Sequence, residues 1–231
     1  MDDSTTRHIL DLSRRGLLRG ATGLAALAAI APAPAHGQAT PVFRSTPFTL
    51  GVASGDPAPD GFVIWTRLAP EPLAADGGMP RAAMMVGWEV AEDEHFARVT
   101  ANGTAIARPE LAHAVHVEVA GLAPGRPFFY RFRAGAEVSR TGRARTAPAP
   151  GSAVSRLRFV SAGCQHYEHG HFTAWAHIAR EADIDFVFHY GDYIYEYRGR
   201  APGQPGWGPL VRPHLGEEIM TLTDYRQRYA Q

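Results

Sequence analysis

The residue types best suited to chemistry follow two apolar segments in the C-terminal half of the chain. Cys164 comes shortly after residues 157–161, Asp192 ends the segment 184–192, and Tyr195 lies just beyond it. A thiolate and a phenolate are strongly donating anions, which suit a high-valent transition ion such as ferric iron. A carboxylate at a strand end can bridge two cations, and a cation nearby lowers the pKa of a thiol or phenol by stabilising its charged form. These residues predict a metal site.

The segments around these residues predict the elements that bring them together. Residues 157–161 and 184–192 are predicted strands, and residues 172–182 fit a helix with one apolar face. A strand, helix, strand order with short connections indicates a parallel βαβ unit. Ligands of open α/β sheets bind beyond the carboxyl ends of the strands, so Cys164 and Asp192 are expected at one edge. Two strands cannot complete a sheet that is buried on both faces, so this domain is expected to have an unfinished core.

A long loop follows the predicted metal site. Residues 199–216 are rich in Gly and Pro, and a loop of this length is usually functional or disordered. Near a metal it would form a rim that controls substrate access. Arg198, Arg200 and Arg212 are candidates to hold a phosphate oxygen, and Arg198 and Arg212 are the two assigned to substrate binding. For each of them the alternative is a solvated arginine.

Other polar residues near the two strands have a structural or an open interpretation. His189 precedes Asp192 on the opposite strand face and is expected to be a hydrogen-bonded structural histidine. His169 and His171 are expected to be solvated in the loop that enters the helix. Glu196 either orients a ligand or forms an ordinary ion pair.

The N-terminal half has a different pattern, in which short strands alternate with turn residues. This pattern predicts a β-sandwich of the fibronectin III or immunoglobulin type. Leu122-Ala123-Pro124-Gly125 before an aromatic strand resembles the corner of fibronectin III domains, but Phe128 stands where the corner Tyr is expected and leaves Tyr130 as a substitute. The named strands are residues 48–54, 61–67, 84–90, 114–119 and 128–133.

A Pro- and Gly-rich segment at residues 147–152 separates the two patterns and indicates a domain boundary. The predicted division is a β-sandwich at residues 40–147, a linker at 148–156 and an incomplete α/β domain at 157–231. The predicted fold class is therefore multidomain, β followed by α/β.

Residues 1–39 are predicted to be an export signal. Arg14 and Arg15 precede a mild apolar run, and the pair resembles the twin-arginine (Tat) type of signal. The run is shorter than the roughly 20 residues that span a bilayer, so no stable membrane span is expected. Cleavage is expected after Ala39, or alternatively after Ala35, which gives a periplasmic or extracellular protein. The alternative is a chance Arg pair before an ordinary amphipathic helix.

Composition excludes several classes of protein. The 231 residues carry 23 Lys+Arg against 23 Asp+Glu, so no broad basic surface for nucleic acid is expected. Every one of these basic residues is Arg, which excludes a catalytic amine and a Walker-type phosphate loop. A single Cys excludes an internal disulfide and a zinc knuckle.

Several motifs together resemble the PhoD-type alkaline phosphatases, a branch of the calcineurin-like metallophosphoesterases. The most specific string runs from Gly191 to Glu196 and reads Gly-Asp-Tyr-Ile-Tyr-Glu. The resemblance covers nearly the whole chain after the signal. Its other parts are residues 51–57, 63–67, 161–165 and 221–230, and in the last of these Thr221 and Asp224 also have the spacing of a capping box.

The resemblance implies a metal-dependent phosphatase or phosphodiesterase that hydrolyses phosphate esters with a metal-activated hydroxide. It implies that Cys164 and Tyr195 bind ferric iron and that Asp192, the catalytic residue, bridges iron to calcium. Compared with the Asp-x-His motif of the wider superfamily, this chain has Cys164-x-His166, which makes His166 a further candidate ligand, although the PhoD-type site does not need it. The family's remaining ligands lie in motifs that this chain lacks, so residues 157–231 would be the first βαβ unit of a truncated metallophosphoesterase domain.

The resulting expectation is an exported, monomeric phosphatase whose partners are a phosphate ester and the Tat machinery, with this chain an incomplete and inactive part of it. Two alternatives remain open. One is an exported β-sandwich binding module with a vestigial metal site, and the other is a prematurely stopped reading frame without a stable product. An unfinished sheet at residues 157–231 would be digested rapidly by proteases.

Overall fold

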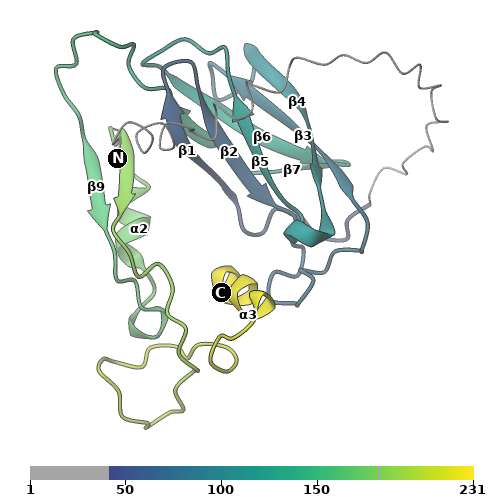
Figure 1. The fold of residues 1–231 in the computed structure, drawn as a ribbon, viewed down its shortest axis with the longest axis vertical. Helices are drawn as coiled ribbons and strands as arrows, with labels where there is room; N and C mark the ends of the chain where they lie inside the picture. Colours follow the sequence, from purple (N-terminus) through teal and green to yellow (C-terminus); the bar gives the residue numbers. More distant parts are fainter. Residues whose placement is uncertain (1–41, 182) are drawn as a thin grey trace, which may run out of the picture. The chain divides into compact units, whose positions relative to one another are not determined.

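Two antiparallel β-sheets form the N-terminal half of the computed structural model, which describes residues 42–181 and 183–231 (Figure 1). The predicted export signal, with Arg14 and Arg15, lies outside the described residues. The first sheet has the order β1-β2-β5 and the second β4-β3-β6-β7, with β8 also paired to β6. The strands are β1 (Val52–Ala58), β2 (Gly61–Arg67), β3 (Met84–Ala91), β4 (Val99–Ala107), β5 (Ala114–Val119), β6 (Pro127–Ala134), β7 (Glu137–Val138) and β8 (Gly142–Arg145), with a short 3-10 helix η1 (Pro109–Leu111) before β5.

The core of the sandwich lies between these sheets because alternate side chains of each strand point inward. In β6, Phe128, Tyr130 and Phe132 are buried while their neighbours are more exposed. Phe62 of β2 packs against Phe128 with ring centroids 6.1 Å apart, which joins the two sheets. Burial of this apolar surface is the main force that stabilises the sandwich.

The predicted bounds of β2 and β5 are confirmed, and those of β3 and β6 differ by one residue at one or both ends. The bounds predicted for the first strand are wrong. It begins at Val52 and continues through Gly55-Asp56-Pro57 to Ala58, with a register shift between Gly55 and Ala58. β1 is an edge strand, where a bulge and a proline without an N–H are tolerated.

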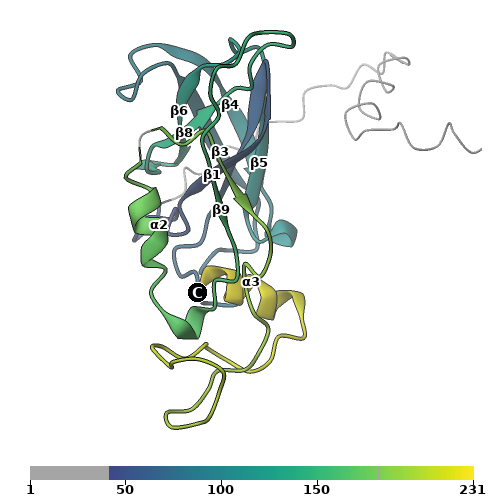
Figure 2. The same cartoon turned by 90° about the vertical axis from the view of Figure 1, so that its left-hand side faces the viewer.

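The C-terminal half contains β9 (Phe159–Ala162), the 3-10 helix η2 (Tyr167–His169), α2 (Thr173–Ile178) and β10 (Phe186–His189) (Figure 2). β9 and β10 are parallel, with Phe159 opposite Phe186 and Ala162 opposite His189. The helix is shorter than the predicted 172–182, because Phe172 has a left-handed conformation before it and Ala179 and Arg180 form a turn after it.

The two-stranded sheet leaves large apolar side chains in contact with solvent. Phe159 is 54% exposed and Phe188 is 55% exposed, whereas the core aromatics of the sandwich are almost inaccessible. Such a sheet buries too little apolar surface to be stable alone. The assignment of this unit to a metallophosphoesterase domain and the division at residues 148–156 remain proposals.

The last element is α3 (Leu222–Ala230), and its start is fixed by the predicted capping box. Asp224 Oδ2 accepts a hydrogen bond from the Thr221 N–H at 2.8 Å, and Thr221 Oγ1 accepts one from the Asp224 N–H at 3.3 Å. Both bonds satisfy N–H groups that have no partner inside the helix. Among the described helices, none is long and apolar enough to cross a membrane.

Replacing Thr221 by Ala is expected to destabilise α3 by about 1 kcal/mol, because the cap of the helix is lost. Amide exchange of residues 223–230 should become faster, while Thr221→Ser should leave it nearly unchanged. Equal exchange in all three proteins would show that the capping box contributes nothing.

Candidate functional site

The two candidate ligands that follow β9 and β10 lie in turns that are bonded to each other. The Cys164 N–H donates to Gly191 O at 3.0 Å, and the Gln165 N–H donates to Asp192 O at 3.1 Å. Cys164 has φ 54° and Asp192 has φ 52°, both in the left-handed region. This conformation costs energy for residues with a side chain, and such strain concentrates at functional sites. The parallel pairing of the strands therefore continues into a strained double turn that presents both side chains.

The side chains of Cys164, Asp192 and Tyr195 meet at one carboxylate oxygen. The Cys164 thiol donates to Asp192 Oδ2 at 3.3 Å, and the Tyr195 hydroxyl donates to the same oxygen at 2.9 Å. The hydrogen bond to Asp192 raises the pKa of the Cys164 thiol, with smaller contributions from burial and the carboxylate charge. Burial, followed by the Asp192 hydrogen bond and charge, raises the pKa of Tyr195 well above its ordinary value.

This donor set fits part of a transition-metal site. One carboxylate, one thiol and one phenol converge, and a cation at that point would replace the two shared protons. No group of three or more His, Cys, Asp and Glu side chains suited to a metal is found in the part of the chain that the structure describes. By themselves, the three residues would be only part of a coordination shell.

His166 lies beside these residues, but its Nδ1 is engaged elsewhere. It accepts a hydrogen bond from the Glu168 N–H at 3.3 Å and so caps η2. The ring is buried and stacks on His169, with centroids 4.1 Å apart, and also contacts Tyr195. Burial, with the charges of His169 and His214, lowers the pKa of His166 to about 4, so the imidazole is neutral near pH 7.

The structure corrects the expected environment of two other histidines. His169 was predicted to be solvated, but it is half-buried between His166 and Trp207. His189 was predicted to be fully hydrogen-bonded. Its Nδ1 accepts from the Gly191 N–H at 3.4 Å, while its Nε2 is buried and has no hydrogen-bond partner among the described residues. Aromatic packing against Trp175 and Tyr193 holds this ring in place.

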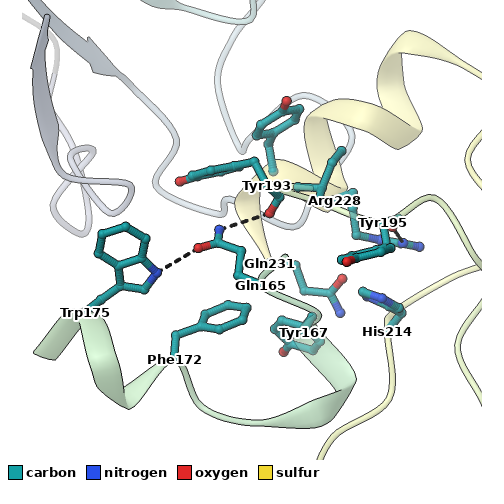
Figure 3. A pocket seen from close by; sticks show the side chains of 11 residues that line it. Gln165, Tyr167, Phe172, Trp175, Tyr193, Tyr195, His214, Arg228 and Gln231 are labelled. Carbon is teal, nitrogen blue, oxygen red and sulfur yellow. Dashed lines mark hydrogen bonds between the residues drawn. The ribbon is translucent and has the colours of Figure 1, made fainter. Parts of the chain in front are cut away.

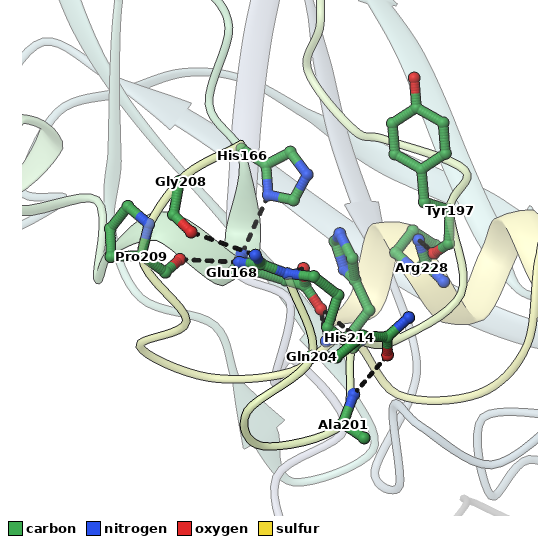
Figure 4. Close-up of polar contacts among 10 residues, drawn as sticks. His166, Glu168, Tyr197, Ala201, Gln204, Gly208, Pro209, His214 and Arg228 are labelled. Atoms are coloured by element: carbon green, nitrogen blue, oxygen red, sulfur yellow. Dashed lines mark hydrogen bonds and ion pairs between the residues drawn. The ribbon is translucent and has the colours of Figure 1, made fainter. Parts of the chain in front are cut away.

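The sequence did not single out Glu168, which is 2% exposed and organises the long loop (Figure 4). Its Oε1 accepts from the N–H groups of Arg200 and His214, at 2.8 and 3.2 Å. Its Oε2 accepts from Arg200 Nε at 2.7 Å, and its backbone O accepts from the Val211 N–H. One buried carboxylate thus binds both ends of the loop at residues 200–214. A single Glu between histidines gives no pattern from which this role could be predicted.

The three arginines considered for phosphate binding have different surroundings. Arg200 is bonded to Glu168 and also donates to Gly208 O and Pro209 O, so its guanidinium already has partners. The guanidinium of Arg212 lies 3.6 Å from the ring centroid of Tyr167, and its Nε donates to Tyr167 O. Arg198 forms an exposed ion pair with Glu217 at 3.5 Å. Within the described residues 42–181 and 183–231, neither Arg198 nor Arg212 contacts Asp192.

A cavity of about 400 Å³ lies next to Tyr195 (Figure 3). Its wall is largely aromatic, and Trp175 Nε1 donates to Gln165 Oε1 within it at 2.7 Å. Glu196, left open by the sequence, lies outside this wall and accepts from the Tyr225 hydroxyl at 3.4 Å. The lining residues are Gln165, Tyr167, Phe172, Trp175, Tyr193, Ile194, Tyr195, His214, Arg228, Tyr229 and Gln231.

The loop is expected to lose stability in acid because of Glu168. Burial acts to raise the pKa of Glu168, but the hydrogen bonds from Arg200 and His214 outweigh it and lower the pKa from 4.5 to about 2. The carboxylate therefore stabilises the fold fully above about pH 4.5, and this contribution is lost as the pH falls toward 2. The pKa of His166 is lowered from 6.5 to about 4, so this ring is neutral in the folded state and its protonation in acid also destabilises the fold. Urea unfolding, followed by tryptophan fluorescence at about pH 5 and about pH 3, measures the change.

Glu168→Gln isolates the contribution of the carboxylate. The variant should be less stable at about pH 5 and should show a smaller difference between the two pH values than the wild type. The same difference in both proteins would show that Glu168 does not titrate in this range.

Comparison with known proteins identifies relatives of both halves. Residues 32–148 match the family model of the PhoD-like phosphatase N-terminal domain, and residues 159–231 match that of the PhoD-like phosphatase. Alkaline phosphatase D of Bacillus subtilis (strain 168) is 54% identical over 194 residues, which are 84% of this chain and 32% of that protein. A solved structure of PhoD is similar with a TM-score of 0.77 and 52% identity, over 82% of this chain and 36% of the other. The chain thus spans about a third of the length of these relatives.

Proposed function

Because the chain belongs to the PhoD-like phosphatase family, we propose that it provides the β-sandwich and the first metal ligands of a metal-dependent enzyme that hydrolyses phosphate esters. The observation that carries this proposal is the convergence of the Cys164 thiol and the Tyr195 hydroxyl on Asp192 Oδ2. A metal-activated hydroxide would attack phosphorus directly, so no Ser or Cys nucleophile is required. Bound cations would supply Lewis acidity toward the phosphoryl oxygens and acidify water.

Each of the three residues has a distinct task in this proposal. Asp192, at the centre, would hold the cations, which the family resemblance gives as iron and calcium. Cys164 and Tyr195 would each release the proton that they now donate to Asp192 and bind ferric iron as anions. His166 is buried with its Nδ1 engaged, so it would support the position of Tyr195 by contact rather than bind metal.

The remaining ligands are not supplied by these 231 residues. Three donors cannot close a site for several cations, and hydrolysis by the chain alone is expected to be very weak. The aromatic cavity and the loop at residues 199–216 would shape access to the site. Export by the twin-arginine route is part of the proposal and rests on the sequence of residues 1–39.

Iron binding by the chain tests the proposal directly. A ferric ion held by a phenolate absorbs visible light by charge transfer, so the chain incubated with Fe³⁺ should become coloured. Tyr195→Phe should remove this band. Tyr197 lies in the same segment and is 58% exposed, so Tyr197→Phe is the matched control. This variant should keep the charge-transfer band. Iron content is measured in parallel after desalting.

Hydrolysis of p-nitrophenyl phosphate and of its diester, with Fe³⁺ and Ca²⁺ present, completes the experiment. A rate near that of a whole phosphatase would refute the expectation that the chain alone is nearly inactive. Absence of the coloured complex in the wild-type chain, or its persistence in Tyr195→Phe, would refute the assignment of Tyr195 as an iron ligand.

A further inference from the structure

Arg228 of α3 is a buried cation whose hydrogen-bond partners are carbonyl groups of the segment that follows the candidate metal site. Its side chain is among the buried polar groups, at 6% exposed. Nη1 donates to the backbone O of Tyr195 and, at 3.0 Å, to that of Tyr197. Nη2 donates to Glu217 O at 3.4 Å. One guanidinium therefore spans the backbone on both sides of Glu196 and the start of the segment that leads into α3.

Burial of a guanidinium is unfavourable unless its donors are satisfied. Hydrogen bonds from a charged donor are worth more than neutral ones, and the planar fork of Arg can hold several acceptors in a fixed arrangement. Burial also lowers the pKa of Arg228, and the carboxylates of Glu168 and Glu196 act in the opposite direction. Because Nη1 donates to both the Tyr195 and the Tyr197 carbonyl, these are the groups that Arg228 fixes most directly.

The two residues before Arg228 connect the same helix to the β-sandwich. Arg226 Nη2 donates to Glu110 O at 2.8 Å, and its own backbone O accepts from Arg67 Nη1 at 3.5 Å. Gln227 Nε2 donates to Leu73 O at 3.0 Å. Successive residues of a helix point about 100° apart, so Arg226 and Arg228 reach different neighbours from the same rigid element.

We propose that Arg228 is a positioning residue for the backbone of Tyr195, and that α3 is the element through which the β-sandwich holds the Tyr195 segment. This proposal rests on the proposed function where it treats Tyr195 as an iron ligand. The sandwich then helps to position the metal site through α3, although none of its residues lies among the candidate ligands. Figure 3 shows Arg228 reaching from the helix toward Tyr195.

Hydrogen–deuterium exchange of the 231-residue chain, measured without metal, tests whether Arg228 positions the Tyr195 segment. In Arg228→Gln, the amides of Gly199 and Ile219, which donate to Gly216 O and Glu196 O, should exchange at least about 10-fold faster, since at least about 1.4 kcal/mol of charged hydrogen bonding is removed. The strands β2, β3 and β6 should keep their protection. Arg228→Lys should restore part of the protection, because one ammonium can reach only some of the carbonyls. Arg98→Gln makes the same change at an exposed arginine of the sandwich and is the matched control. It should leave amide exchange unchanged.

A double variant tests the connection to the sandwich. In Arg226→Ala with Gln227→Ala, both side-chain contacts to Glu110 and Leu73 are absent while Arg228 is intact. The amides of Gly199 and Ile219 should again exchange faster. Unchanged exchange would overturn the role of the sandwich, and unchanged exchange in Arg228→Gln would overturn the role of Arg228. Uniform loss of protection that includes β2 and β6 would assign Arg228 to general stability and also overturn the proposal.

The ferric-phenolate band provides a second readout. Arg228→Gln should weaken the band at a given Fe³⁺ concentration, and Arg228→Lys should recover part of it. A full-strength band in Arg228→Gln would overturn the link between Arg228 and the ligand. If the wild-type chain shows no band, the metal proposal fails, while the exchange result still decides the role of Arg228.

Discussion

Replacing Asp192 by Asn is expected to lower the affinity of the chain for Fe³⁺ by more than about 100-fold, since loss of an outer-shell partner alone costs 10- to 100-fold. The substitution keeps the size of the side chain but removes the charge on which the Cys164 thiol and the Tyr195 hydroxyl converge. An amide binds hard cations more weakly and cannot bridge them as a carboxylate does. Competition with a coloured iron chelator measures the affinity.

Asp183→Asn is the matched control for this prediction. Asp183 lies just before β10 and forms surface ion pairs with Arg156 and Arg158, so the same loss of charge occurs in the same half of the chain. This variant should bind iron like the wild type. Equal affinities of Asp192→Asn and the wild type would remove Asp192 from the ligand set and with it the centre of the proposed site.

Replacing Glu168 by Ala is expected to destabilise the folded segment 200–214 by about 3–5 kcal/mol, the usual cost of breaking a buried ion pair from one side. The side chain of Arg200 is 14% exposed and would lose its charged partner, and the N–H groups of Arg200 and His214 would lose their acceptor. Amide exchange of Arg200, Val211 and His214 reports the opening of the segment. Trp207 fluorescence should change as well, because Trp207 packs on His166 and His169.

Glu217→Ala provides the comparison, since its ion pair with Arg198 is exposed on both sides. Exposed pairs contribute little, so this variant should stay within about 0.5 kcal/mol of the wild type. A small effect of Glu168→Ala, similar to that of Glu217→Ala, would mean that Glu168 does not hold the loop. Collapse of the whole chain is separated from local opening by the exchange of β2 and β6, which should not change.

Elements with local signals were predictable from the order of their residues. β5 was predicted with its observed bounds because alternation of apolar residues follows directly from the pleat of a strand, and β2 because turn residues bound its apolar run. The capping box of α3 was predictable since Thr221 and Asp224 satisfy each other within one turn. The strand, helix, strand order also placed Cys164 and Asp192 together, because parallel strands deliver their carboxyl ends to one edge.

Which charged residues are buried, and which groups they bind, depends on contacts between distant segments. Glu168 and Arg200 are 32 residues apart, and Arg228 reaches Tyr195 across 33 residues, so no local pattern connects them. In the sequence, an arginine in a loop or on a short helix is expected to be solvated, because burial of charge is unfavourable without partners. Here the partners are backbone carbonyls and a single carboxylate brought together by the fold. Their positions depend on how distant segments pack, and packing is what composition, periodicity and spacing leave undetermined.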